Sequence, residues 1–104
     1  MIARVWTTGV RPQRIDDCEK FTREIFLPVF RAQQGFLGCV MSHRHSVAQI
    51  LTFLCDVDAI TAFEQSSSYR VTLQKILATV LLAGRQSTAA GHVHLYGLGA
   101  SIAK

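Results

Sequence analysis

Residues 2–36 read IARVWTTGVRPQRIDDCEKFTREIFLPVFRAQQGF, and this stretch decides the fold. Its first apolar run, residues 2–8, predicts a strand. Apolar residues then recur at steps of three and four from Ile15 to Val29, which is the period of an amphipathic helix. A second apolar run opens at Phe36. The stretch therefore predicts a strand, a long helix and the start of a second strand.

Two prolines and a glycine set the limits of this helix. Pro12 suits the turn that leads into it, because its fixed φ matches that of the first helical residues. Pro28 lacks an amide hydrogen and crowds the preceding turn, so we expect a kink or the end of the regular helix there. Gly35 is expected to end the helix in a left-handed conformation.

The middle of the chain predicts a β-hairpin. Residues 36–44 and 47–55 are both rich in Val, Leu, Ile, Phe and Cys, and only His45 and Ser46 separate them. Because so short a connection joins neighbouring antiparallel strands, the two runs are expected to pair with each other.

Two further helices are predicted after the hairpin. Asp56 or Asp58 would cap the first, which carries Phe63 on its apolar face and is interrupted by the serines at 66–68. The second would end near Gly84. Its apolar face would consist of Tyr69, Leu73, Ile76, Leu77 and Val80.

The C-terminal part is predicted as a polar loop at residues 85–91, a last strand at 92–98 and a tail at 99–104. The order is then β-α-β-β-α-β, the ferredoxin-like α+β unit, with a four-stranded antiparallel sheet in a single domain of residues 1–98. Helices would cover one face of the sheet. The other face also carries apolar residues in every strand, so a partner is expected to cover it in a sheet-to-sheet homodimer.

Composition allows two interpretations of the apolar content. Hydrophobic residues make up 49% of the chain and charged residues 17%. For a chain of 104 residues this favours either a surface buried by self-association or simply a well-filled core.

The net charge of +4 does not indicate a nucleic-acid partner, because the lysines and arginines are spread along the chain without a basic cluster.

Cys18, Cys39 and Cys55 fall among apolar residues without CxxC spacing, and are expected to be small buried side chains in a reducing compartment. The longest apolar run, residues 76–83, is too short to span a bilayer, and the N-terminus lacks the apolar run of a signal peptide. A cytoplasmic protein without a membrane partner is expected.

The histidines form two His-x-His pairs, His43/His45 and His92/His94. Residues two apart on a strand point to one face, so each pair could offer two imidazoles to a metal. In a ferredoxin-like sheet the second and fourth strands are opposite edges, and the two pairs are expected at the same end, where only a partner's edge could join them. Because no carboxylate or thiolate completes either pair at ligand spacing, no metal site is predicted.

Three stretches of the sequence resemble a known family. The opening MIARVW at residues 1–6, the helix end LPVFRAQQGF at 27–36 and the stretch DAITAFEQSSSY at 58–69 are similar to the antibiotic biosynthesis monooxygenase-like family. The resemblance covers residues 1–98 and implies a dimeric α/β barrel built from ferredoxin-like protomers, each with a pocket between its sheet and its helices. Members include cofactor-independent oxygenases of phenolic or quinol substrates, haem-degrading enzymes, and proteins without known activity.

The resemblance argues against haem chemistry. Haem-degrading members have an Asn where this chain has Trp6, a Trp where it has Phe63 and an iron-ligating His where it has Leu73. A leucine cannot bind iron, so no haem and no other cofactor are expected.

Other members differ from this chain as well. A His commonly occupies the position of Phe63, and a Trp often occupies that of Leu54, whereas Ser66 and Tyr69 match the family pattern. A serine beside a helix break and an aromatic residue on a helix face also serve structural roles.

A ligand pocket is predicted from the aromatic residues. Strand parity puts Trp6 on one face with Arg4 and Thr8, and the resemblance implies that this face is the helix side, where Trp6, Phe63 and Tyr69 would line one cavity. These three are the candidate substrate-binding residues, and His94 and Tyr96 are considered as further pocket linings. The same aromatic residues could instead belong to the core or the dimer interface.

Two functions are consistent with these residues. The first is a cofactor-independent monooxygenase of an aromatic substrate, in which His43 or His94 would take a phenolic proton. The alternative is a non-catalytic homodimer that binds an apolar or aromatic metabolite. An enzyme needs an ionisable group aimed at the ligand, whereas a binding protein needs only shape.

Overall fold

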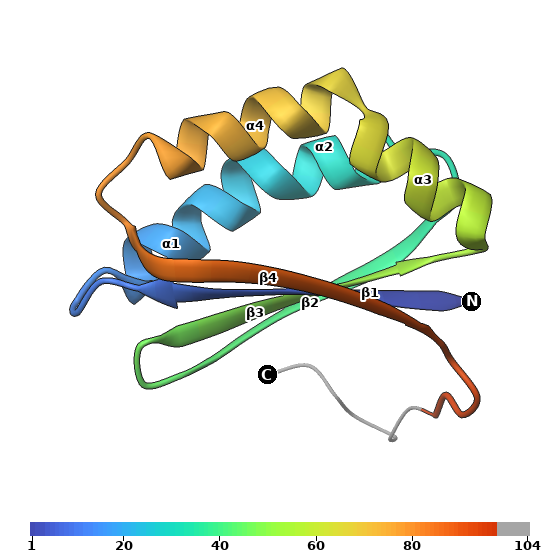
Figure 1. The fold of residues 1–104 in the computed structure, drawn as a ribbon, viewed down its shortest axis with the longest axis horizontal. Coiled ribbons are helices and arrows are strands. Elements are labelled where there is room, and N and C mark those ends of the chain that lie inside the picture. Colours follow the sequence, from blue (N-terminus) through green and yellow to red (C-terminus); the bar gives the residue numbers. More distant parts are fainter. Residues whose placement is uncertain (98–104) are drawn as a thin grey trace.

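A computed structural model describes residues 1–97 of the chain. The elements are β1 (Ile2–Val10), α1 (Ile15–Phe21), the π-helical η1 (Thr22–Phe26), α2 (Leu27–Arg31), β2 (Phe36–Arg44), β3 (Val47–Leu54), α3 (Val57–Gln65), α4 (Ser67–Leu77) and β4 (Leu82–His92). The strands form one four-stranded sheet in the order β2-β3-β1-β4, and each neighbouring pair is antiparallel. All helices lie on one face of this sheet (Figure 1). The predicted ferredoxin-like α+β fold is confirmed.

The first helix is continuous but irregular. Between α1 and α2, residues Thr22–Phe26 widen into a π-helical segment, and the helix passes through Pro28 to reach Arg31. Pro28 cannot donate the amide hydrogen that the preceding turn expects, and the wider turn accommodates this loss. The segment also directs Phe26 into the core, where its ring is almost fully buried.

Side chains cap the two later helices. Oδ1 of Asp56 accepts a hydrogen bond of 2.8 Å from the amide of Ala59 and so begins α3. Oγ of Ser66 accepts one of 3.3 Å from the amide of Tyr69 and so begins α4. Of the two aspartates considered from the sequence, Asp56 is the cap, and the serine stretch is the expected break between helices.

The last strand differs from the sequence prediction. Helix α4 ends at Leu77 instead of near Gly84, and β4 occupies Leu82–His92, including the residues 85–91 that were predicted as a loop. The prediction failed because this strand pairs only with β1, so it lies at an edge of the sheet. From Gly84 onward its residues are exposed on both faces, and they show no apolar alternation.

The chain after β4 turns beneath the sheet. Residues 93–97, predicted as strand, follow β4 without regular structure on the side away from the helices (Figure 1). There the ring of Tyr96 lies edge-on to that of Phe53, 6.5 Å between centroids. Leu98 and the predicted tail at 99–104 lie outside the described residues.

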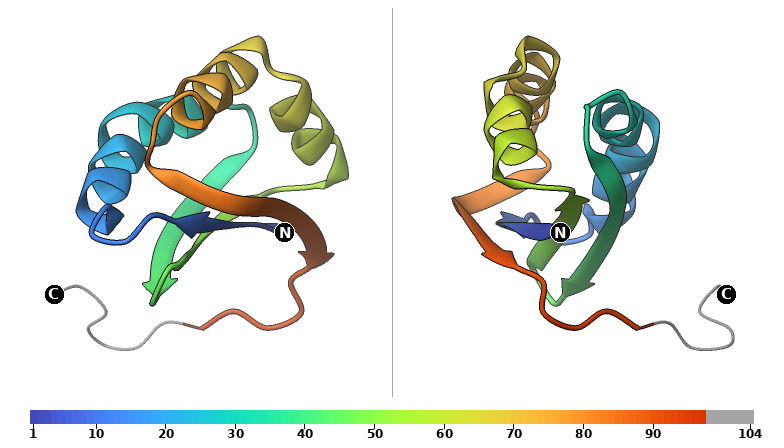
Figure 2. Two further views of the ribbon diagram at one scale, coloured as in Figure 1. Left: turned by 60° about the vertical axis from the view of Figure 1, so that its left-hand side comes forward. Right: turned by 90° about the vertical axis from the view of Figure 1, so that its right-hand side faces the viewer.

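The two faces of the sheet differ in burial. The helix-facing side chains of β1 and β3 are buried and form the core with the helices. The helices and the sheet form two layers (Figure 2). The opposite face is formed by the alternate residues, among them Val5, Val40, Leu51 and Phe53, which are half-buried or exposed.

Among residues 1–97, no helix is both long and apolar enough to cross a membrane.

Candidate functional site

A pocket of about 330 Å³ lies between α4 and the β1–β4 half of the sheet. It is lined by Arg4, Trp6, Glu64, Tyr69, Arg70, Leu73, Leu77, Gln86, Ser87 and Thr88. The backbone register explains the free space. Arg4 pairs with Ala90 and Trp6 pairs with Thr88, so β4 offers only small side chains opposite two large ones on the helix-facing side. Helix α4 therefore roofs an area that the edge strand leaves partly empty.

Aromatic rings form the inner wall of this pocket. Trp6 on β1 lies 6.0 Å from the ring of Phe26, and Tyr69 on α4 lies 4.6 Å from the ring of Phe63. Phe26 also lies 6.5 Å from Tyr69, which joins the two pairs into one cluster. Trp6 and Tyr69 are 6% and 5% exposed, and both line the pocket.

A buried arginine is the main polar feature of the site. Arg4 lies on the same helix-facing side of β1 as Trp6, two positions before it, and its side chain is only 6% exposed. Its Nε donates a hydrogen bond of 3.0 Å to Oε2 of Glu64, and its Nη2 donates one of 3.0 Å to the hydroxyl of Tyr69. Its guanidinium carbon also lies 5.1 Å from the ring centroid of Phe63. An ion pair, a hydroxyl and an aromatic face together compensate the loss of hydration.

The candidate substrate-binding residues are found close together but in different roles. Trp6 and Tyr69 line the pocket, whereas Phe63 is fully buried and supports Arg4 from behind. Leu73, which the sequence resemblance aligns with the iron ligand of haem-degrading members, lines this pocket. The three aromatic residues thus belong to one cluster, in which only two reach the cavity.

The candidate bases are not at the pocket. His43 is on the helix-facing side of β2, but it is exposed near the end of that strand, which forms the opposite edge of the sheet. His94 was predicted within the last strand, but it follows β4 and is exposed. Tyr96, considered as a pocket lining, instead contacts Phe53 on the face away from the helices.

The expected placement of the histidine pairs at one end of the sheet is wrong. His43 pairs with Ala48, which in turn pairs with Thr8, whereas His92 pairs with Ile2 near the start of β1. The two pairs therefore lie at opposite ends as well as opposite edges. Within residues 1–97, no group of three or more His, Cys, Asp or Glu side chains is arranged to hold a metal ion.

Arg4 and Glu64 were missed as site residues by sequence reasoning. The signal for Arg4 was present, because it stands two positions before Trp6 on a strand face that is otherwise predicted to be buried. Charged residues are rarely buried without a partner, so this position already implied one. Glu64 gave no signal, since it appears among other polar residues on the outer side of α3.

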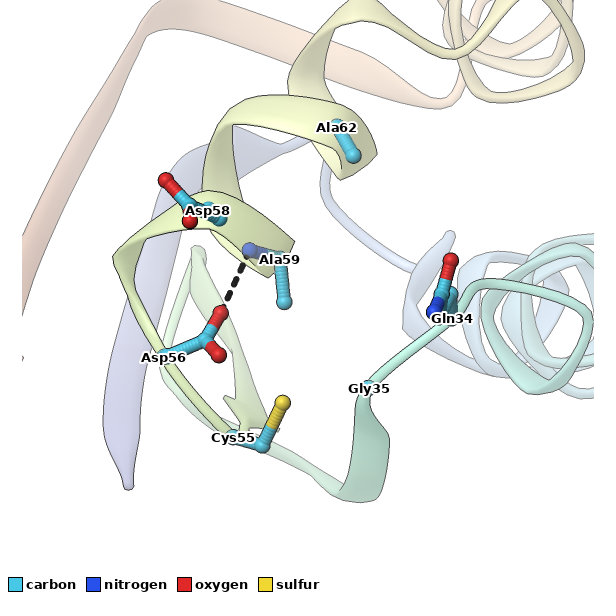
Figure 3. A pocket seen from close by; sticks show the side chains of 7 residues that line it. All are labelled: Gln34, Gly35, Cys55, Asp56, Asp58, Ala59 and Ala62. Atoms are coloured by element: carbon cyan, nitrogen blue, oxygen red, sulfur yellow. Dashed lines mark hydrogen bonds between the residues drawn. The ribbon is translucent and has the colours of Figure 1, made fainter.

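The remaining hollows are poorer candidates. One of about 270 Å³ lies at the start of α3, between Gly35 and Cys55 (Figure 3). Gly35 has a φ of +82°, and a Cβ there would lie 2.8 Å from Sγ of Cys55, so only glycine fits. Asp56, which lines this hollow, is engaged in capping the helix. Another hollow, at the β2–β3 hairpin, contains His43 and is lined by exposed side chains alone.

The cysteines do not form a reactive centre. All three are free, and burial raises the pKa of the Cys18 and Cys39 thiols, which keeps them protonated and unreactive. Cys55 is exposed, contrary to the expectation that all three would be buried, because it follows the last residue of β3.

Comparison with solved structures identifies the fold. No family model and no curated protein matches the sequence. A candidate antibiotic biosynthesis monooxygenase from Bordetella bronchiseptica superposes with a TM-score of 0.77 at 17% identity, over 90% of this chain and 97% of the other. The chain has the antibiotic biosynthesis monooxygenase fold. This finding confirms the fold implied by the resemblance of residues 1–6, 27–36 and 58–69.

Two further solved structures match most of the chain. A mutant of SnoaB, a cofactor-independent oxygenase from Streptomyces nogalater, matches with a TM-score of 0.72 at 13% identity, over 91% of this chain and 94% of the other. NE2512 from Nitrosomonas europaea, a protein of unknown function, matches with a TM-score of 0.74 at 14% identity, over 96% and 95%. The structural similarity establishes the fold. At identities this low it does not establish the activity, which has to be argued from the pocket.

Proposed function

We propose that this chain is a small-molecule protein that binds an aromatic compound in the Arg4–Trp6–Tyr69 pocket and oxidises it with dioxygen without a cofactor. The observation that carries the proposal is the combination, in one cavity, of aromatic walls and a buried guanidinium. Rings supply contact area for a flat ligand, and the cation stabilises negative charge that develops on its oxygen. The fold is shared with SnoaB, a cofactor-independent oxygenase.

The proposed reaction needs no external reductant. A phenol with a free ring position loses its proton to solvent water as it binds beside Arg4, and the electron-rich ring carbon forms a bond to dioxygen. The O–O bond then breaks, so that one oxygen atom stays on the ring as a quinone carbonyl and the other leaves as water. The phenol supplies all the electrons that dioxygen accepts. The role of Arg4 is to hold the phenolate, because a buried cation favours the charged form of a neighbouring acid.

A second candidate function is binding without catalysis. It is favoured by the absence of a histidine among the residues that line the pocket, and by the engagement of the Glu64 carboxylate with Arg4. Without a group to take the phenolic proton, the pocket would only hold an aromatic metabolite.

The assembly that we propose is a homodimer formed sheet to sheet, in a cytoplasmic setting. Val5, Leu51 and Val40 lie on the sheet face away from the helices, where a second copy would bury them. Free thiols are typical of proteins in reducing compartments.

Dioxygen consumption distinguishes the two functions. The protein is incubated with a panel of one-ring and two-ring phenols in air, and oxygen uptake is recorded beside the quinone absorbance. Oxidation predicts one dioxygen consumed for each quinone formed, with one labelled oxygen atom in the product from ¹⁸O₂. The binding function would be favoured if at least one phenol shifts the indole N–H signal of Trp6 in an NMR spectrum and no phenol of the panel causes oxygen uptake.

A further inference from the structure

Arg4 is held in the pocket as a fixed cation. Its side chain is 6% exposed, its guanidinium lies 5.3 Å from the ring centroid of Tyr69, and its Nη2 is hydrogen-bonded to the hydroxyl of the same residue. The guanidinium has several N–H donors in a rigid fork, and the hydrogen bonds found within residues 1–97 use Nε and Nη2. A cation in this position cannot turn out to solvent without breaking the packing around β1.

Glu64, the partner of Arg4, is held far less firmly. Its side chain is 44% exposed, and the contact that joins it to Arg4 is a single hydrogen bond from Nε to Oε2. It also stands in the last turn of α3, where the partial negative charge of a helix end disfavours a carboxylate. The Glu64 carboxylate can therefore return to water at little cost, whereas Arg4 must keep an anionic partner.

We propose that Glu64 stands in for the acidic group of the ligand, and that this ligand is a small aromatic anion, a carboxylate or a phenolate. On binding, a ligand oxygen replaces Oε2 of Glu64 on Arg4, and an arginine fork can donate to two ligand oxygens where it now donates to one oxygen of Glu64. The ring of the ligand then lies along Trp6 and Leu73. This inference rests on the proposed aromatic pocket and names the class of compound that it accepts.

Charge and size support this choice of ligand. Arg70 also lines the pocket, and its Nε donates a hydrogen bond of 3.1 Å to the backbone carbonyl of Glu64, so the lining holds two arginines and one carboxylate. Once Glu64 moves aside, the cavity is strongly positive. Its volume of about 330 Å³ is near the lower limit of small-molecule sites, roughly 300 Å³, which suits a compound of one or two rings.

Benzoate and benzamide provide the test, because they share a ring and differ in charge. Each is titrated to millimolar concentration while the indole N–H signal of Trp6, the single tryptophan of the chain, is followed by NMR. Benzoate is expected to bind about tenfold more tightly than benzamide, in line with an added charge-assisted contact. Glu64→Gln should strengthen benzoate binding about threefold and leave benzamide unchanged, because it removes the competing charge.

Asp58→Asn is the matched control. It removes one negative charge from the same helix, α3, at an exposed position that does not line this pocket, so it should not alter either affinity. Equal affinities for the two probes, or equal effects of Glu64→Gln and Asp58→Asn, would overturn the anion proposal and leave the aromatic pocket standing. If neither probe shifts the Trp6 signal, the proposal and the pocket on which it rests are both overturned.

Discussion

The hydroxyl of Tyr69 accepts a hydrogen bond of 3.0 Å from Nη2 of Arg4, although the two residues lie 65 positions apart in the chain. This bond ties the first strand to the last helix at the pocket. It also fixes the orientation of the guanidinium, on which the proposed binding of an anionic ring depends. The two residues therefore link the stability of the fold to the chemistry of the site.

Tyr69→Phe tests the structural side of this link. The substitution keeps the ring in the aromatic cluster and removes the acceptor, so a donor of a buried cation is left unpaired. We expect the free energy of unfolding in urea to fall by about 1 to 3 kcal/mol. Tyr96→Phe is the matched control, because Tyr96 is exposed, and it should leave stability unchanged. An unchanged midpoint for Tyr69→Phe would show that the hydrogen bond contributes little.

Trp6→Phe tests the ligand wall. Trp6 packs against Phe26 in the core, so truncation to alanine would open a cavity and is expected to destabilise the fold by about 3 to 5 kcal/mol. Phenylalanine keeps most of the packing but reduces the aromatic surface that lines the pocket. Benzoate affinity, measured by calorimetry, should weaken by about 1 kcal/mol. Phe21→Leu, in a half-buried residue outside the pocket lining, should leave it unchanged.

Leu51→Lys tests the proposed homodimer. Leu51 lies near the middle of the face away from the helices, and a charge there would have to be buried between two sheets. Sedimentation at micromolar concentration should show a dimer for the unaltered chain and a monomer for the variant. Val57→Lys, at an exposed position on α3, should remain dimeric. A folded monomer of the unaltered chain would contradict the dimer directly.

Haem titration tests the role of Leu73. This residue contributes a leucine side chain to the pocket, where haem-degrading relatives were expected to place a ligand. We expect only weak, broad changes in the haem spectrum. A sharp ligated Soret band that saturates near one equivalent would show that another residue takes the place of the missing histidine.

The sequence predicted most of the architecture because the decisive elements carry strong periodic patterns. Residues from Ile15 to Val29 repeat with helical spacing, and the hairpin strands on either side of His45 are rich in apolar residues. The strand β4 was misplaced, since an exposed edge strand is held by backbone pairing and needs no apolar alternation. Its pairing with β1 depends on residues that are distant in sequence, which no local window reveals.

The site was predicted only in part for a similar reason. Strand parity and the family resemblance together put Trp6 on the helix side, but they could not show that Arg4, on the same face, contacts Glu64 and Tyr69. That meeting depends on the angle at which α3 and α4 cross the sheet. The histidine pairs were misplaced because β4 ends at His92, whereas the predicted strand began there, and the two ends of a strand lie at opposite ends of the sheet.

The position of a bound probe tests the central claim most directly. Intermolecular NOEs are recorded between the ring protons of benzoate and the side chains of the protein. The side chains that give NOEs distinguish binding in the pocket from binding on the open face of the sheet. An aromatic ligand in the proposed site predicts NOEs to Trp6, Tyr69 and Leu73. NOEs confined to Phe53 and Tyr96, on the face away from the helices, would contradict the account.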